Sequence, residues 1–184
     1  MKKIFSVLAL IIATNGWAQN ERFADTMTTL SMKDNKVFYE YVYQIDSISK
    51  NELYVRAKNV YLRLFPATKD VIQNEDKENG IIAGKGNTSF IEPGRFGLNL
   101  EQKIRFTLSI TVKDYKYRVQ LFDIYYTSSV AGPIDNPIEI SYLKDYKKNQ
   151  NKFTKTLYRN MNLKLLSTID QVSNEMNKKT NNDF

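Results

Sequence analysis

The chain has 184 residues, 27 Lys and Arg against 20 Asp and Glu, and neither cysteine nor histidine. The lack of cysteine and histidine excludes disulfides, thiolate nucleophiles, zinc–sulfur sites and histidine-dependent catalytic triads. We therefore expect a non-catalytic protein with no metal and no cofactor, held together by a single hydrophobic core.

Residues 1–18 have the order of a secretory signal peptide. Lys2 and Lys3 precede the apolar residues 4–13, and the small residues Gly16 and Ala18 suit cleavage after Ala18. A buried N-terminal strand or helix is the alternative interpretation. The apolar run is too short for a transmembrane helix, which takes about 20 residues. We expect export to the periplasm or beyond, no transmembrane segment in the mature chain, and, without cysteine, no lipoprotein anchor.

The first strand is predicted at 36–46, after a polar lead-in at 19–35. Alternation places Tyr39, Tyr41 and Tyr43 on one face of this strand. Aromatic side chains on a sheet face bind sugars in some proteins. They more often belong to the core, with their hydroxyls reaching a polar partner. We favour the core interpretation for this stripe.

A helix and two short strands follow in the prediction. Ser49 to Glu52 fits a capping box, and Pro66 ends the helix that it starts. Strands at 69–74 and 80–87 flank a charged turn. In the second of these strands, Gly84 and Gly86 indicate a bulge or a close approach of another group to the backbone.

The clearest strand is predicted at 101–113, with a partner strand at 117–126. Residues 104, 106, 108, 110 and 112 are apolar and share one face. A shift in the apolar alternation between Leu121 and Phe122 predicts a β-bulge. The opposite face is polar, and the two strands supply to it Arg105, Thr107, Ser109, Thr111, Lys113, Arg118 and Gln120.

A long final helix is predicted at 151–176, followed by a disordered tail at 177–184. Its predicted buried stripe runs from Phe153 through Leu157 and Met161 to Met176. Between Lys144 and Lys179, nine Lys and Arg stand against three acids. Four of these cations form a basic side near the start of the helix, at Lys148, Lys152, Lys155 and Arg159.

These elements predict an α+β fold of order β-α-β-β-β-β-α over residues 36–176. We expect one curved antiparallel sheet of about five strands with two helices on one face. Because the helices cover only one face, the polar side of the sheet is left open to water or to a partner.

Several segments resemble a known family in their residues and order. In chain order they are Phe38–Val42, Leu53–Phe65, Gly80–Gly86, Lys113–Arg118 and Asp123–Ile124. With the signal peptide, they resemble an exported bacterial family of unknown function that is assigned a TATA-binding-protein-like (TBP-like) fold. The resemblance implies that fold and an envelope location. It implies no activity and no DNA binding, because a fold does not determine a function. Tyr115 departs from the pattern, since we expect glycine in that turn.

Three functional hypotheses remain open. The leading one is a non-catalytic module that binds an anionic envelope component, such as lipid or glycan, and no nucleic acid. The second is an assembly partner that docks through the open sheet face or a strand edge. The third is a glycan hydrolase that uses two carboxylates from the set Glu40, Glu92, Glu101 and Asp123. For the polar sheet face and the basic helix, a plain solvated surface is the alternative to a binding site.

Overall fold

The computed structural model describes residues 29–65, 71–93, 99–128, 136–148 and 151–178. The predicted signal peptide, most of the predicted lead-in and nearly all of the predicted tail lie outside these residues. The elements are β1 (Met32–Lys33), β2 (Lys36–Val37), β3 (Tyr39–Gln44), α2 (Lys50–Leu64), β4 (Ile72–Asp76), β5 (Ile81–Pro93), β6 (Asn99–Lys113), β7 (Lys116–Ser128), β8 (Asn136–Pro137), α3 (Ile138–Lys148) and α4 (Lys152–Asn177).

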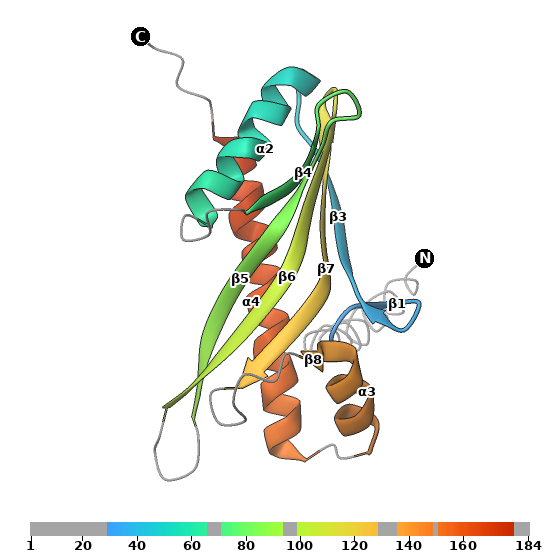
Figure 1. The fold of residues 1–184 in the computed structure, drawn as a ribbon, viewed down its shortest axis with the longest axis vertical. Helices are drawn as coiled ribbons and strands as arrows, with labels where there is room; N and C mark the ends of the chain where they lie inside the picture. Colours follow the sequence, from blue (N-terminus) through green and yellow to red (C-terminus); the bar gives the residue numbers. More distant parts are fainter. Residues whose placement is uncertain (1–28, 66–70, 94–98, 129–135, 149–150, 179–184) are drawn as a thin grey trace, which may run out of the picture.

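The main sheet has six antiparallel strands, in the order β3-β7-β6-β5-β4 with β8 beside β7. The predicted α+β class with an antiparallel sheet is confirmed, but this sheet is larger than predicted and a second, two-stranded sheet accompanies it. The strand expected at 36–46 is divided at Phe38, because Lys36–Val37 pairs with β1 in a separate two-stranded sheet. The sheet twists along its length, and α4 passes behind it (Figure 1).

The core lies between one face of the sheet and the helices α2 and α4. Phe106, Leu108 and Ile110 of β6 point into it and have at most 1% of their surface exposed. The helices supply buried apolar residues at helical spacing, including Leu53, Ala57 and Val60 from α2 and Met161, Leu165 and Ile169 from α4. The alternation in β6 therefore predicted correctly which face is covered.

Side-chain caps begin both long helices. The Ser49 hydroxyl accepts a hydrogen bond from the Glu52 amide at 3.4 Å, as the capping box predicts. Asn151 caps α4 through its side-chain oxygen, which accepts from the Thr154 amide at 2.9 Å. Since each cap satisfies an amide that has no partner within the helix, these two residues define where the helices begin.

Gly84 and Gly86 allow aromatic side chains to pack directly on the backbone of β5. A Cβ atom on Gly86 would lie 2.4 Å from Cε2 of Phe106, and one on Gly84 would lie 2.1 Å from the Val71 carbonyl oxygen. The predicted close approach is confirmed at both glycines. The bulge on this side of the sheet lies in β4, between Ile72 and Asn74.

The predicted bulge in β7 is confirmed, slightly further along than expected. The register with β6 shifts between Arg105 and Thr107, where one additional β7 residue is inserted. Asp123 has φ +49° and is exposed. The bulge therefore turns this carboxylate toward the open face of the sheet.

The β6–β7 turn holds Tyr115 at φ +64°, the region in which we expected glycine. Two backbone hydrogen bonds tie this residue to the loop before α2: the Tyr115 amide donates to the Ile48 carbonyl, and the Ile45 amide donates to the Tyr115 carbonyl. Asp114 also accepts from the Lys50 amide at 2.7 Å. These contacts hold a conformation that costs an ordinary side chain roughly 1–2 kcal/mol.

Two predictions about the C-terminal part are wrong. The described residues contain a third helix, α3, which buries Ile138 and Tyr142 where we predicted none. The ring of Tyr142 packs edge-on against Tyr158 of α4, with centroids 4.8 Å apart. Phe153 is 56% exposed, not buried. Each helical residue turns by about 100°, so Thr154 and Tyr158 share the buried side with Met161, and Phe153 falls beside it.

Candidate functional site

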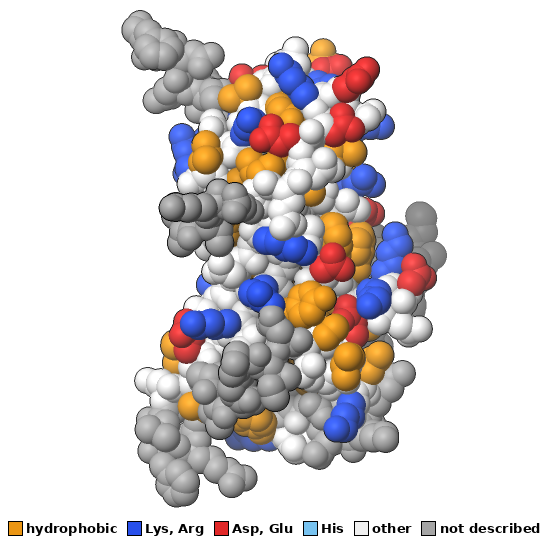
Figure 2. All heavy atoms as spheres, in the orientation of Figure 1, with side chains coloured by type: hydrophobic (Ala, Val, Ile, Leu, Met, Phe, Trp, Pro, Cys, Tyr) orange, Lys and Arg blue, Asp and Glu red, His pale blue; other side chains and the backbone are white. Residues whose placement is uncertain are grey.

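The open face of the sheet carries most of the predicted binding residues. Figure 2 shows Lys and Arg side chains along this face from one end to the other, with separate acidic and apolar side chains between them. The alternation of β6 brings the exposed Arg105 and Lys113 and the half-buried Thr111 to this face, as predicted. Arg118 joins them because it pairs directly with Thr111 across β6 and β7.

A first depression on this face, here called the cationic hollow, has a volume of about 230 Å³. Strand register assembles it, because Val42 pairs with Arg118 and Lys113 pairs with Lys116. The sequence predicted three of its residues and missed the other three, Val42, Lys116 and Tyr117, which the register brings beside them. The hollow is lined by Val42, Thr111, Lys113, Lys116, Tyr117 and Arg118.

The cations of this hollow differ in their partners. Arg118 lies 3.6 Å from the Glu40 carboxylate, which also accepts a hydrogen bond from the Gln120 amide at 2.6 Å. Within the part of the chain that the structure describes, neither Lys113 nor Lys116 has a carboxylate within 4.0 Å. The hollow therefore has more positive charge than its neighbours neutralise, which favours an anion.

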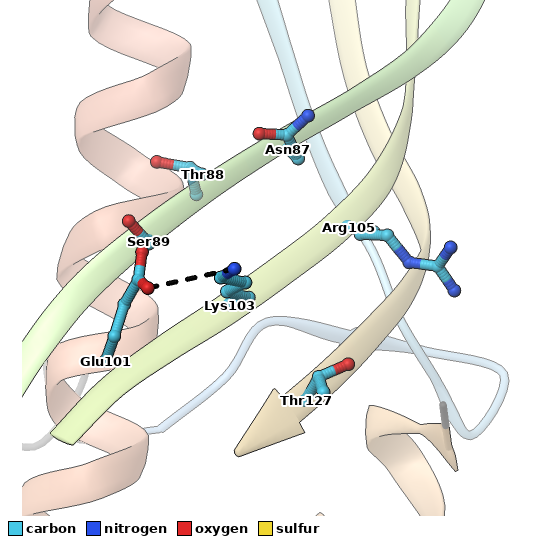
Figure 3. A pocket seen from close by; sticks show the side chains of 7 residues that line it. All are labelled: Asn87, Thr88, Ser89, Glu101, Lys103, Arg105 and Thr127. Carbon is cyan, nitrogen blue, oxygen red and sulfur yellow. Dashed lines mark ion pairs between the residues drawn. The ribbon is translucent and has the colours of Figure 1, made fainter. Parts of the chain in front are cut away.

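A second depression, here called the polar groove, lies further along the same strands (Figure 3) and has a volume of about 570 Å³. The Arg105 guanidinium lies 5.8 Å from the centre of the Tyr125 ring, a cation–π contact. Lys103 and Glu101 form an exposed ion pair of 3.8 Å. The groove is lined by Asn87, Thr88, Ser89, Glu101, Lys103, Arg105 and Thr127.

Thr107 lies between the two depressions and is only 7% exposed. Its hydroxyl accepts a hydrogen bond from Lys85 Nζ at 2.7 Å and donates to Asp123 Oδ2 at 3.4 Å. Thr107 was predicted to be a contact residue of the open face. Its geometry suits it better to position the ammonium group of Lys85.

An aromatic pair lies at the same level of the sheet. The Phe122 ring, opposite Thr107 in the β6–β7 register, lies 6.4 Å from the Phe38 ring. Lys33 Nζ lies 5.1 Å from the centre of the Phe38 ring. Apolar and cationic groups therefore meet on the open face between the hollow and the groove.

The basic residues of α4 form a separate surface. Lys152, Lys155 and Arg159 are all exposed, as predicted, but α4 lies on the opposite side of the sheet from the hollow and the groove. The side chain of Lys148 lies outside the described part of the structure. The structure therefore separates the predicted binding residues into two groups, on the sheet and on the helix.

The four candidate carboxylates do not gather on one face. Glu40, Glu101 and Asp123 are exposed. Glu92 is buried on the side of β5 that faces the helices, opposite to the open face. Among the described residues, both oxygens of Glu92 lack a hydrogen-bond partner, and burial raises the pKa of its carboxyl. Within the same residues, no group of acidic side chains is placed to hold a metal ion, and no helix is long and apolar enough to cross a bilayer.

The tyrosine stripe runs from the core to the surface. Tyr39 is buried and its hydroxyl donates to Asn162 Oδ1 at 2.7 Å, while burial raises the pKa of Tyr39. The Tyr43 ring stacks on Tyr117 at 5.0 Å, and Tyr41 is 40% exposed. The core interpretation therefore applies fully to Tyr39 and only in part to the other two.

The antiparallel sheet with helices on one face defines an α+β domain with a TBP-like fold. The chain belongs to the family described as Domain of unknown function (DUF4468) with TBP-like fold, whose model matches residues 38–127. The predicted resemblance is thereby confirmed. The comparison with curated proteins found no match.

Two crystal structures share the fold. A DUF4468 family protein from Bacteroides ovatus ATCC 8483 is 20% identical, with a TM-score of 0.65 over 85% of this chain and 97% of that chain. A TBP-like protein from Parabacteroides distasonis ATCC 8503 is 17% identical, with a TM-score of 0.64 over 81% of this chain and 97% of that chain. At these identities the likeness establishes the fold alone.

Proposed function

We propose that this chain is an exported, non-catalytic binding module whose open sheet face holds an anionic component of the cell envelope. The observation that carries the proposal is the cationic hollow, which Lys113, Lys116 and Arg118 line together with the apolar side chain of Val42. An exposed cation without an acidic neighbour keeps its full attraction for an anion, and a depression lets several cations reach one ligand.

The basic side of α4 supports the proposal less strongly. Lys152 and Lys155 are exposed on a helix surface. Long exposed cations on a helix also keep a protein soluble, which explains their presence without a ligand. The helix therefore serves as the comparison surface in the test.

The test removes three charges from one surface at a time. The first variant carries Lys113→Gln, Lys116→Gln and Arg118→Gln, and the second carries Lys152→Gln, Lys155→Gln and Arg159→Gln. Binding to polygalacturonate and to phosphatidylglycerol vesicles is measured by calorimetry over a series of salt concentrations. The open-face variant should lose about 10-fold or more in affinity for at least one probe, and its salt dependence should flatten.

The helix variant is the matched control, because it removes the same amount of charge from the other side of the molecule. It should bind as the unmodified chain does, apart from a small change due to net charge. Equal losses in both variants would show that only overall charge matters. A loss confined to the helix variant would move the site to α4. Either result would contradict the proposal for the sheet face.

A further inference from the structure

The hollow and the groove lie on the same face of the same strands. The centre of the hollow lies near Thr111 of β6, and the groove lies near Lys103 of the same strand. These residues are eight positions apart, which corresponds to ~26 Å at the rise of an extended strand. A ligand that contacted both depressions would therefore have to be elongated and lie along the strands.

The side chains along this path differ from one depression to the next. The wall of the hollow is mostly apolar and is formed by Val42 and the side chains of Lys113, Lys116 and Arg118, whose exposed cations attract an anionic group. The groove is lined by the amide of Asn87 and the hydroxyls of Thr88 and Ser89, with Arg105 and the Glu101–Lys103 ion pair beside them. Hydroxyl and amide groups suit a ligand that itself carries many hydroxyls, because each can both donate and accept hydrogen bonds.

Between the depressions the face is aromatic. Phe122 is partly exposed at the level of Thr107, next to the Lys85 ammonium group that Thr107 holds. An aromatic ring provides a flat apolar surface, on which the apolar face of a sugar can lie. Cations, hydroxyls and an apolar surface therefore follow one another along the strands, with the exposed carboxylates of Asp123 and Glu101 beside them.

We infer that the open face binds an acidic polysaccharide, laid along β6 and β7 from the cationic hollow to the polar groove. This inference rests on the proposed function and names its ligand class. A lipid headgroup would occupy only one depression, whereas a chain of sugar acids matches the repeated cations, the hydroxyls and the separation of the two depressions. Linking two weak contacts in one ligand raises its affinity without any new type of contact.

The test compares two lengths of the same ligand, a short oligogalacturonide that fills one depression and a long one that exceeds ~26 Å. The long oligomer should bind the unmodified chain at least ~10-fold more tightly than the short one, since it reaches both depressions. Lys113→Gln removes a cation at one end of the path, and Lys103→Gln removes one at the other end. Each variant should bind the long oligomer only about as tightly as it binds the short one. Lys155→Gln on α4 is the control and should leave the length effect intact.

The outcomes separate this inference from the proposed function. If the unmodified chain bound both lengths equally and Lys103→Gln had no effect, the inference that one ligand contacts both depressions would be overturned. The proposed function, anion binding at the hollow, would stand. Binding to phosphatidylglycerol vesicles or to single-stranded DNA of matched length, without binding to oligogalacturonides, would overturn the polysaccharide assignment. Binding to none of these anions would overturn both proposals.

Discussion

Glu92 is a buried carboxylate that the described residues leave without a hydrogen-bond partner. Burial disfavours its charged form and raises the pKa of its carboxyl above the ordinary value. Below the unfolded pKa of ~4.3, both folded and unfolded chains hold the proton, so Glu92 adds no charge-dependent cost to folding. As pH rises above that value, the unfolded chain releases the proton more readily, so the fold loses stability.

We predict that Glu92→Gln stabilises the protein at pH 7 by ~1–3 kcal/mol, because the amide needs no charge to be desolvated. The gain should disappear below about pH 4, where the carboxyl of the unmodified chain is protonated in both states. Urea unfolding at several pH values measures it. Glu101→Gln, an exposed change on β6, should alter stability little at any pH. A gain from Glu92→Gln that is equal at pH 4 and pH 7 would contradict the argument.

Arg56 joins α2 to the end of α4. Its guanidinium donates from Nη1 to the Met176 carbonyl oxygen and from Nε to Glu52, both at 3.0 Å, and the residue is 6% exposed. One of the carbonyls that α4 cannot satisfy internally is therefore capped by a residue of another helix. Arg63 contacts the same region, but its 3.2 Å pair with Glu175 is largely exposed on the arginine side.

This difference predicts unequal effects of two chemically identical substitutions. Arg56→Met keeps the apolar stem and removes a buried charged hydrogen bond, so it should cost ~1.5–3 kcal/mol of unfolding free energy. Arg63→Met removes a surface ion pair and should cost less than ~1 kcal/mol. Urea unfolding of both variants measures the difference. Equal losses would mean that Arg56 does not connect the two helices in the way its contacts indicate.

Elements with a long and regular pattern were predictable from the sequence. The alternation from Ile104 to Val112 identified β6 and both of its faces, and Ser49 identified the start of α2. The helix α3 was missed because, among its residues whose side chains the structure describes (138–144), only Ile138, Glu139 and Tyr142 are buried, too few apolar positions to establish a helical period. Pro137, which we interpreted as part of a loop, directly precedes this helix, where proline is tolerated.

The candidate site was predictable only one strand at a time. Arg105, Thr111, Lys113 and Arg118 follow from alternation within β6 and β7. The residues that complete the depressions, such as Val42 and Asn87, come from strands whose register the sequence does not specify. A register change of one residue would place their side chains on the other face, so only the folded sheet shows which of them meet.

At the scale of the whole molecule, the amino-acid composition does not indicate that the open sheet face is basic. Residues 19–143 contain sixteen cations and sixteen acids, so this segment is neutral overall. The acids Glu75, Asp76 and Glu78 lie at the β4–β5 turn, at the same end of the sheet as the hollow, because Ile81 after this turn pairs with Thr111. Among the described residues, however, no carboxylate lies within 4.0 Å of Lys113 or Lys116. A basic binding surface can therefore arise from a segment without net charge, and the excess charge of α4 does not locate it.

The proposed envelope ligand is reached only if the chain is exported, and the predicted signal peptide allows a separate test of export. Signal peptidase needs small residues at the last and third-last positions before the cut, which are Ala18 and Gly16 here. Expression in a bacterial host should therefore yield an envelope protein whose intact mass corresponds to a chain that begins at Gln19. Ala18→Leu should block processing and leave the full-length mass. Trp17→Leu changes the tolerant position between the two small residues and should be processed normally. Full-length protein recovered from the cytoplasm of the unmodified strain would contradict export, and the candidate ligands would then have to be sought inside the cell.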